Sequence, residues 1–179
     1  EGATDFLDAS TYTGSLTATL TDGGERVDGD AVNDLADITV TGGAGNDTIV
    51  ATALSTAGLE YAIDGGAGND TITIGATPDN ATATNVGDVY SGGEGSVDVL
   101  VTDVDLVDTG TALLTTALTG VSGFEVLALT GFAAEANTVT VANVQADLAR
   151  VDIATATSGQ TTIAFGSGAY TVGIGPTAA

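Results

Sequence analysis

Short stretches in which apolar and polar residues alternate recur along the whole chain, separated by runs rich in glycine, asparagine and aspartate. Residues 38–41 (ITVT) and 71–74 (TITI) are clear examples. Alternation with a period of two places every second side chain on one face, which is the pattern of a half-buried β-strand. We therefore expect an all-β chain, with one helical turn at residues 144–150 and an ambiguous stretch at 111–118. The expected strands are residues 15–20, 38–41, 48–50, 61–64, 71–74, 88–90, 99–101, 124–131, 138–141, 151–153, 161–165 and 170–174.

Two of the turns between these strands are identical. Residues 42–49 and 65–72 both have the sequence GGAGNDTI. Their glycines let the backbone turn tightly, so that several carbonyl groups can face one point, and Asp47 and Asp70 each add a carboxylate. Calcium takes about six to eight oxygen ligands from carboxylates and carbonyls, and one such turn is too small to surround it. The pattern predicts Ca²⁺ held between stacked turns.

The same residues also allow an interpretation without a metal. Glycine, asparagine and aspartate all favour tight turns, so both copies can be plain turns. We favour calcium because aspartate occupies the same place in both copies, where a plain turn would accept asparagine or serine.

The spacing of the glycine pairs predicts how the turns stack. The pairs begin at residues 23, 42, 65 and 92, which gives steps of 19, 23 and 27 residues. Each step fits one coil of a solenoid, with a glycine turn on one side and a longer loop on the other. The copy at 92–98 has one inserted residue before Asp98, and the copy at 22–28 is degraded. Because neighbouring strands lie about 4.8 Å apart, we expect the turns at 42, 65 and 92 to share ions along one edge.

No linker or change of composition divides the chain. We therefore predict that residues 1–179 form a single right-handed parallel β-roll or β-helix solenoid. Residues 1–102 are its expected calcium-binding half, and residues 103–179 its metal-poor half. In the second half, Asp103 and Asp105 share a strand face. We favour a solvated acidic face there over a further cation site.

Charge and composition narrow the function. The 179 residues include 24 Asp and Glu against 2 Lys and Arg, giving a net charge of −22. Nucleic acid and anionic lipid are therefore poor partners, and no apolar run is long enough for membrane insertion. The absence of Cys and His excludes disulfides, thiolate or imidazole metal sites, and Cys- or His-based catalysis. Such an acidic, Lys- and Cys-free chain is typical of an extracellular bacterial protein, where millimolar calcium suits charge-dense sites.

The glycine turns also resemble a known family. Residues 42–50 and 65–73 match the nonapeptide GGxGxDxUx of the RTX repeats, found in proteins exported by type I secretion. Residues 124–131 (FEVLALTG) resemble strands of RTX-type surface-layer proteins. The resemblance implies export in an unfolded state and folding on meeting calcium. The usual C-terminal secretion signal is not recognisable at residues 175–179, so we expect this end to be internal to a longer chain.

The resemblance further implies a set of ligands. One turn would give the carbonyls of its first and third positions and its aspartate, and the next turn the carbonyls of its second and fourth positions and its aspartate. The first ion would lie among Gly42, Ala44, Asp47, Gly66, Gly68 and Asp70. The second would lie among Gly65, Ala67, Asp70, Gly93, Gly95 and Asp98. The insertion at Ser96 and Val97 puts the second site in question.

Three classes of function remain open at this stage. We favour a calcium-dependent structural module of an extracellular assembly, such as a surface layer, filament or matrix, because a solenoid has open ends that invite self-association. A cell-surface polysaccharide is a further candidate partner. The alternative is a passive RTX module of a larger secreted exoenzyme or adhesin. An enzyme is the least favoured class, because the only basic residues are Arg26 and Arg150 and aromatic residues are scarce.

Overall fold

The computed structural model describes residues 5–20, 38–51, 61–75, 87–103, 119–131, 137–145, 148–153, 161–165 and 170–174. These residues form short strands and one four-residue helix, α1 (Val141–Val144). The strands are β1 (Asp5–Asp8), β2 (Thr17–Thr19), β3 (Ile38–Thr41), β4 (Thr48–Ala51), β5 (Tyr61–Asp64), β6 (Thr71–Ile74), β7 (Val89–Ser91), β8 (Val99–Asp103), β9 (Val121–Ser122), β10 (Val126–Thr130), β11 (Asn137–Thr140), β12 (Arg150–Ile153), β13 (Thr161–Ala164) and β14 (Thr171–Ile174).

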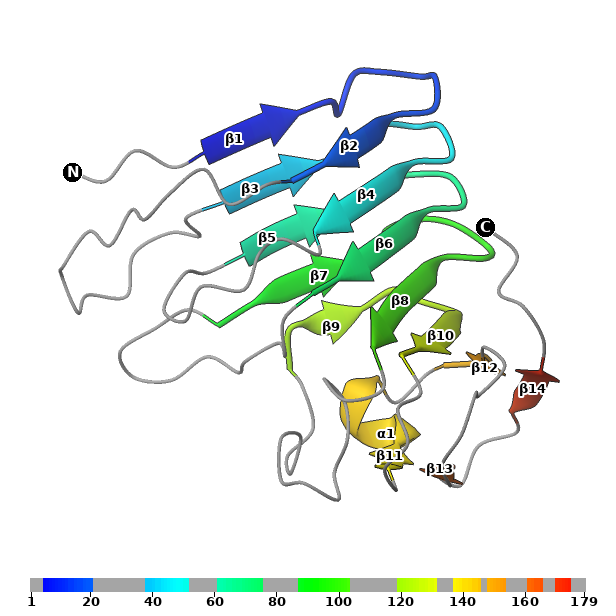
Figure 1. Ribbon diagram of the computed structural model, residues 1–179. Coiled ribbons are helices and arrows are strands. Elements are labelled where there is room, and N and C mark those ends of the chain that lie inside the picture. Colours follow the sequence, from blue (N-terminus) through cyan, green and yellow to red (C-terminus); the bar gives the residue numbers. More distant parts are fainter. Residues whose placement is uncertain are drawn as a thin grey trace, which may run out of the picture.

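The strands stack into two main parallel sheets. One has the order β1-β3-β5-β7-β9, the other the order β14-β12-β10-β8-β6-β4-β2, and β11 and β13 form a small third sheet. Odd and even strands alternate along the chain, so each coil adds one strand to each main sheet as far as β9 and β10 (Figure 1). The predicted all-β class, a parallel β-roll or β-helix, is confirmed.

Several details differ from the sequence-based expectation. Strands β1 and β9 were not predicted. The helical turn expected at 144–150 is wrongly placed, because α1 ends at Val144, Gln145 is extended and Arg150 begins β12. The expected turn at 22–28, the ambiguous stretch at 111–118 and Asp105 lie outside the described residues.

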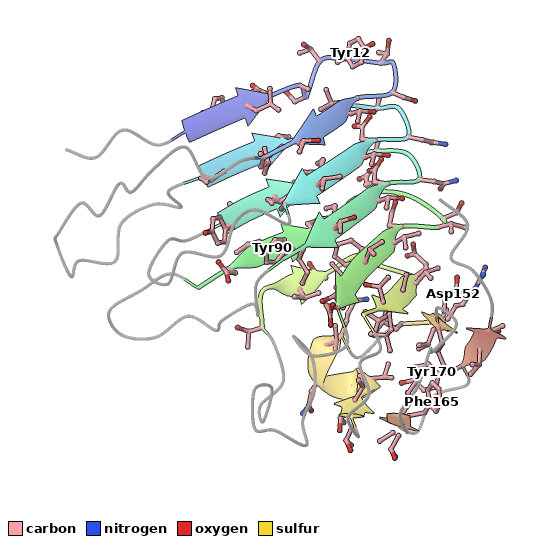
Figure 2. All side chains as sticks on the ribbon, viewed as in Figure 1. Tyr12, Tyr90, Asp152, Phe165 and Tyr170 are labelled. Atoms are coloured by element: carbon pink, nitrogen blue, oxygen red, sulfur yellow. The ribbon has the colours of Figure 1, made fainter. Side chains whose placement is uncertain are left out.

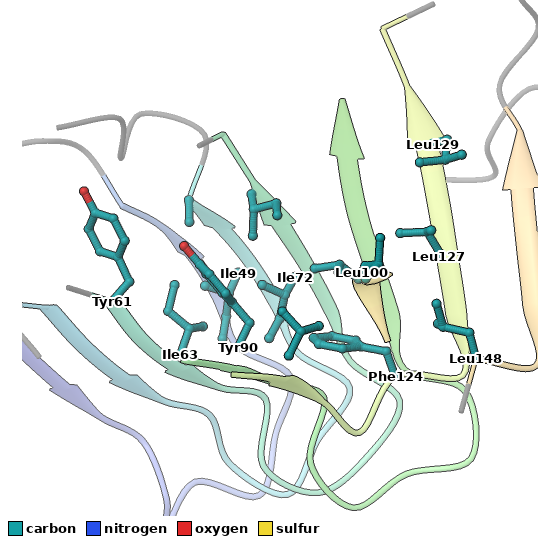
Figure 3. Packing of buried hydrophobic residues seen from close by; sticks show 14 of the residues in the cluster. Ile49, Tyr61, Ile63, Ile72, Tyr90, Leu100, Phe124, Leu127, Leu129 and Leu148 are labelled. Atoms are coloured by element: carbon teal, nitrogen blue, oxygen red, sulfur yellow. The ribbon is translucent and has the colours of Figure 1, made fainter. Parts of the chain in front are cut away.

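The core consists of columns of equivalent side chains that run from coil to coil. In the seven-stranded sheet one column is Ala18, Ile49, Ile72, Leu100, Leu127, Val151 and Val172. In the five-stranded sheet the facing column is Leu7, Val40, Ile63, Tyr90 and Val121. Figure 3 shows the middle of both columns, with Ile49, Ile72 and Leu100 following one another and Ile63 and Tyr90 next to them. Alternation of apolar and polar residues produces this arrangement, because only every second side chain points inward.

Candidate cation-binding turns

The turns that join the two main sheets lie directly on one another. Ala67 N–H donates to the carbonyl of Gly43 at 2.8 Å, and Glu94 N–H donates to the carbonyl of Gly66 at 2.6 Å. Gly68 N–H in turn donates to the carbonyl of Glu94 at 2.9 Å. The predicted stacking of the turns at 42–47, 65–70 and 92–98 along one edge is therefore confirmed (Figure 1).

A further turn, residues 9–16, precedes these three in the stack. Ala44 N–H donates to the carbonyl of Tyr12 at 2.8 Å, which places residues 9–16 against the turn at 42–47. This turn has no glycine pair and has Leu16 where the others have aspartate. The sequence pattern at 22–28 instead falls in the connection from β2 to β3, whereas every stacked turn leads from an odd strand to an even one.

The glycines of the turns are required by the close approach of successive coils. A Cβ added to Gly65 would lie 2.6 Å from the carbonyl oxygen of Gly92 in the next coil and 2.5 Å from Asp70 Oδ2. A Cβ on Gly42 would overlap the carbonyl of Gly65 in the same way. Real Cβ atoms do not approach backbone oxygens this closely, so the glycine pairs have a structural reason that is independent of any metal.

The aspartates of the motif form a ladder inside the stack. Each carboxylate accepts a hydrogen bond from the backbone of the preceding coil: Leu16 N–H donates to Asp47 Oδ1 at 2.8 Å, Asp47 N–H to Asp70 Oδ1 at 2.7 Å, and Asp70 N–H to Asp98 Oδ1 at 2.7 Å. All three aspartate side chains are buried, with at most 1% of each residue exposed. Hydrogen bonds from backbone N–H groups stabilise ionised carboxylates, and the ladder places three carboxyl groups in one buried row.

Glu125 adds a fourth step to this ladder. Asp98 N–H donates to Glu125 Oε2 at 2.8 Å, and Val126, the next residue, pairs with Val99 in the sheet. No sequence signal pointed to this role, because the turn before Glu125 has no glycine pair and Glu125 lies at the start of an apolar strand. The pattern FEVLALTG marked the strand but not its ladder position.

The second carboxylate oxygens of the three aspartates are not equivalent. Asp47 Oδ2 accepts a hydrogen bond from Gly43 N–H at 2.8 Å. Asp70 Oδ2 and Asp98 Oδ2 are buried and have no hydrogen-bond partner. A buried polar atom without a partner costs about 1–3 kcal/mol, and such an atom on a carboxylate is a natural ligand for a cation.

The burial of these aspartates also shifts their pKa values. Burial, together with the negative charges of Asp47, Asp98 and Asp64, raises the pKa of Asp70 from 3.8 to about 6, although the hydrogen bond from Asp47 N–H acts in the opposite direction. Burial also raises the pKa of Asp98, with a contribution from the charge of Glu125. Ionising these two neighbouring buried carboxyl groups is unfavourable, and a bound cation would reduce that cost.

A second ladder runs along the surface of the turns in the opposite direction. Asn69 N–H donates to Asn46 Oδ1 at 3.0 Å, and the N–H and hydroxyl of Ser96 both lie 3.2 Å from Asn69 Oδ1. Here the side chain of one coil accepts from the backbone of the following coil. This explains the asparagine of the repeated motif as a link between coils.

The turn that contains Phe124 and Glu125 is held by a side-chain amide. Gln145, directly after α1, accepts from Phe124 N–H through Oε1 at 3.1 Å and donates from Nε2 to the carbonyl of Phe124 at 2.7 Å. The side chain thus satisfies a backbone N–H and carbonyl of the turn that contains Glu125.

All the residues predicted as metal ligands lie in the stacked turns. The structure brings together the predicted set Gly42, Ala44, Asp47, Gly65, Gly66, Ala67, Gly68, Asp70, Gly93, Gly95 and Asp98. No group of three or more His, Cys, Asp or Glu side chains arranged to hold a metal occurs in the part of the chain that the structure describes. The ligands that the turns offer are instead pairs of carboxylates together with backbone carbonyls.

Comparisons with known proteins add no family to this description. No protein-family model, curated protein or solved structure matches the chain. Within the described ranges, no helix is long and apolar enough to cross a membrane. The inference of function therefore depends on the turns themselves.

Proposed function

We propose that this chain is a calcium-dependent structural module of an extracellular bacterial assembly, such as a surface layer, filament or matrix. The observation that carries the proposal is the pair of buried carboxylate oxygens without partners, Asp70 Oδ2 and Asp98 Oδ2, in adjacent stacked turns. These oxygens are suited to a hard divalent cation, which accepts ligands from carboxylates and carbonyls together.

The residues present fit such an ion best between the second and third glycine turns. Asp70 and Asp98 would supply carboxylate oxygens there, and the carbonyls of Gly65, Ala67, Gly93 and Gly95 are the candidate neutral ligands. Asp47 is less suited, because both of its oxygens already accept hydrogen bonds. The second of the two sequence-predicted sites is thus the better supported one, despite its inserted residue.

The overall charge favours the same conclusion. The chain carries −22, and the side chain of Arg150, the one basic residue within the described part, is half-exposed and pairs with Asp152 on β12 at 2.6 Å. A divalent ion in the row would offset charge that no basic side chain of the described residues reaches.

Self-association is supported by the ends of the solenoid. Leu7 and Val172 end the two core columns and are 38% and 45% exposed, while their equivalents inside the stack are buried. Phe6 and Tyr12 are also exposed on the first coil, and Figure 2 shows Tyr12 at this end and Phe165 and Tyr170 at the other. Edge strands with exposed apolar side chains favour pairing with another chain, so we propose a homopolymer or lattice in which calcium adds stability to the coils.

A calcium titration of chelator-treated protein tests both parts of the proposal. Circular dichroism would report folding, and light scattering would report particle size. We expect calcium to stabilise a fold that already forms in chelator, so that near the melting temperature of the chelator-treated protein the β-signal and the particle size increase together with calcium. Folding without growth in size would favour the alternative, a passive module of a larger exoenzyme or adhesin. No response to calcium in either signal would refute the proposed function.

A further inference from the structure

The two turns with identical sequence have different structures. In the turn at 42–47, Gly43 N–H donates to Asp47 Oδ2 within the same turn. In the turn at 65–70, the equivalent donor, Gly66 N–H, donates to Asp64 Oδ1 at 3.2 Å, and Asp70 Oδ2 is left without a partner. The difference cannot come from residues 42–49 and 65–72 themselves, because these are the same.

The backbone differs at the same place. Gly66 has a φ of 95°, in the left-handed region, whereas Gly43 does not lie in that region. With this φ, the residues that follow Gly66 are placed so that its N–H faces away from the aspartate that ends the turn, and the N–H bonds to Asp64 instead. Gly93, in the turn at 92–98, has a similar φ of 94°. The first turn is thus closed on its own aspartate, and the second is open.

The residue before each glycine pair is the nearest difference in sequence. Thr41 and Asp64 are paired neighbours in the five-stranded sheet, at the end of β3 and of β5. Thr41 has no carboxylate to offer Gly43 N–H. Asp64 does, and a carboxylate two residues before a turn N–H is a favoured acceptor for it. Asp8, in the same column, accepts from Ser10 N–H at 2.9 Å in the same way.

We propose that Asp64 is a positioning residue for the cation site: by taking Gly66 N–H, it keeps Asp70 Oδ2 available to a divalent cation such as Ca²⁺. The inference rests on the proposed function for the identity of the ion. In the turn at 92–98, Ser91 occupies the equivalent place, and Asp98 Oδ2 is also without a partner. That turn has an inserted residue before Asp98 and so a different length, and the proposed role of Asp64 concerns only the two identical copies.

The first experiment needs no calcium. Amide hydrogen exchange of the chelator-treated protein would compare the wild type with Asp64→Thr, which introduces the residue found at position 41. We expect the Gly66 amide to exchange about tenfold more slowly in the variant, because its N–H then bonds to a buried carboxylate oxygen. Asp64→Asn keeps an acceptor for Gly66 N–H and should exchange as the wild type does. An unchanged Gly66 rate in Asp64→Thr would overturn the proposal.

The second experiment measures calcium binding by titration calorimetry with CaCl₂. Asp64→Thr should lose one bound ion or bind it at least about tenfold more weakly, while Asp64→Asn should stay within about threefold of the wild type. Thr41→Asp should open the first turn and gain an ion, which also keeps the test decisive if Asp64→Thr does not fold. Asp8→Thr is the matched control, because its turn has Leu16 in place of the aspartate, and its binding should equal the wild type.

The outcomes separate the two proposals. If the wild type binds no calcium while Gly66 exchange slows in Asp64→Thr, the proposed function fails and the hydrogen-bond role of Asp64 stands without its ion. If the wild type binds calcium and both Asp64→Thr and Thr41→Asp bind as it does, the role of Asp64 is refuted. Equal losses in Asp64→Asn and Asp64→Thr would show that charge, not the hydrogen bond, is what Asp64 contributes, and would also refute it.

Discussion

Replacing Asp70 by asparagine should have opposite effects on stability with and without calcium. The Oδ1 atom of the introduced asparagine can still accept from Asp47 N–H, and no hydrogen bond is lost at Oδ2, which has no donor. Without calcium, the substitution removes a carboxyl group whose pKa is raised to about 6 by burial and by neighbouring carboxylates, so that its ionised form is unfavourable in the folded state. We therefore expect Asp70→Asn to be as stable as the wild type or more stable at pH 7 in chelator.

With calcium the order should reverse. An ion that binds only the folded state stabilises it by about 2.7 kcal/mol when its concentration is 100 times its Kd. For a chain of this length, about 1 kcal/mol shifts Tm by roughly 2–4 °C, so one site corresponds to a shift of roughly 5–11 °C. Asp70→Asn should lose that shift, because it removes a ligand oxygen and a charge. Thermal unfolding followed by circular dichroism in chelator and in excess CaCl₂ measures both effects.

Asp47→Asn is the matched control, at the same ladder position in a turn of the same sequence. Both oxygens of Asp47 accept backbone hydrogen bonds, and an amide offers only one acceptor. We expect this variant to lose about 1–3 kcal/mol of stability in both buffers, while keeping its calcium shift. The reasoning would be refuted if Asp70→Asn behaved like Asp47→Asn, destabilised in chelator with an intact calcium shift.

Three further outcomes are expected. The pKa of Asp70 is about 6 in the folded state and near 3.8 when unfolded, so the folded protein binds more protons between these pH values. Its free energy of unfolding in chelator should therefore fall as pH rises from about 4 to about 6. Urea titrations at several pH values would measure this, and a rise in the free energy of unfolding would contradict it. Glu125→Ala should cost about 1–3 kcal/mol because the N–H of Asp98 loses its acceptor, whereas Glu125→Gln should be close to the wild type in the same titrations. Gly65→Ala should prevent the coils from stacking, since its Cβ would meet the carbonyl of Gly92, and loss of the cooperative melting transition would report it.

The sequence was most informative where structure is set by local rules. Alternation of apolar and polar residues located strands such as β3 and β6, and the glycine pairs located three of the stacked turns. Strand β1 was missed because Phe6 and Leu7 are adjacent apolar residues, and Leu7, although it continues the core column, is 38% exposed at the end of the sheet. The turn at 9–16 was missed because it stacks without a glycine pair.

Sequence reasoning failed where the answer depends on the neighbouring coil. Two copies of GGAGNDTI led to the same local prediction, yet one is closed and one is open, because the deciding contacts come from outside the motif. Glu125 was missed for the same reason: its role is visible only once β8 and β10 are side by side. The sequence could predict that these turn residues come together, but not which aspartate has a carboxylate oxygen without a hydrogen-bond partner.

The direction of the aspartate ladder bears on the order in which the chain can fold. Each backbone N–H finds its carboxylate in the following coil, 23, 28 and 27 residues further along for Asp47, Asp70 and Asp98. A chain that emerges from a ribosome or a channel with its N-terminus first therefore cannot complete a turn until the next coil has also emerged. Each turn of the aspartate ladder is therefore completed only one coil after its own residues have emerged.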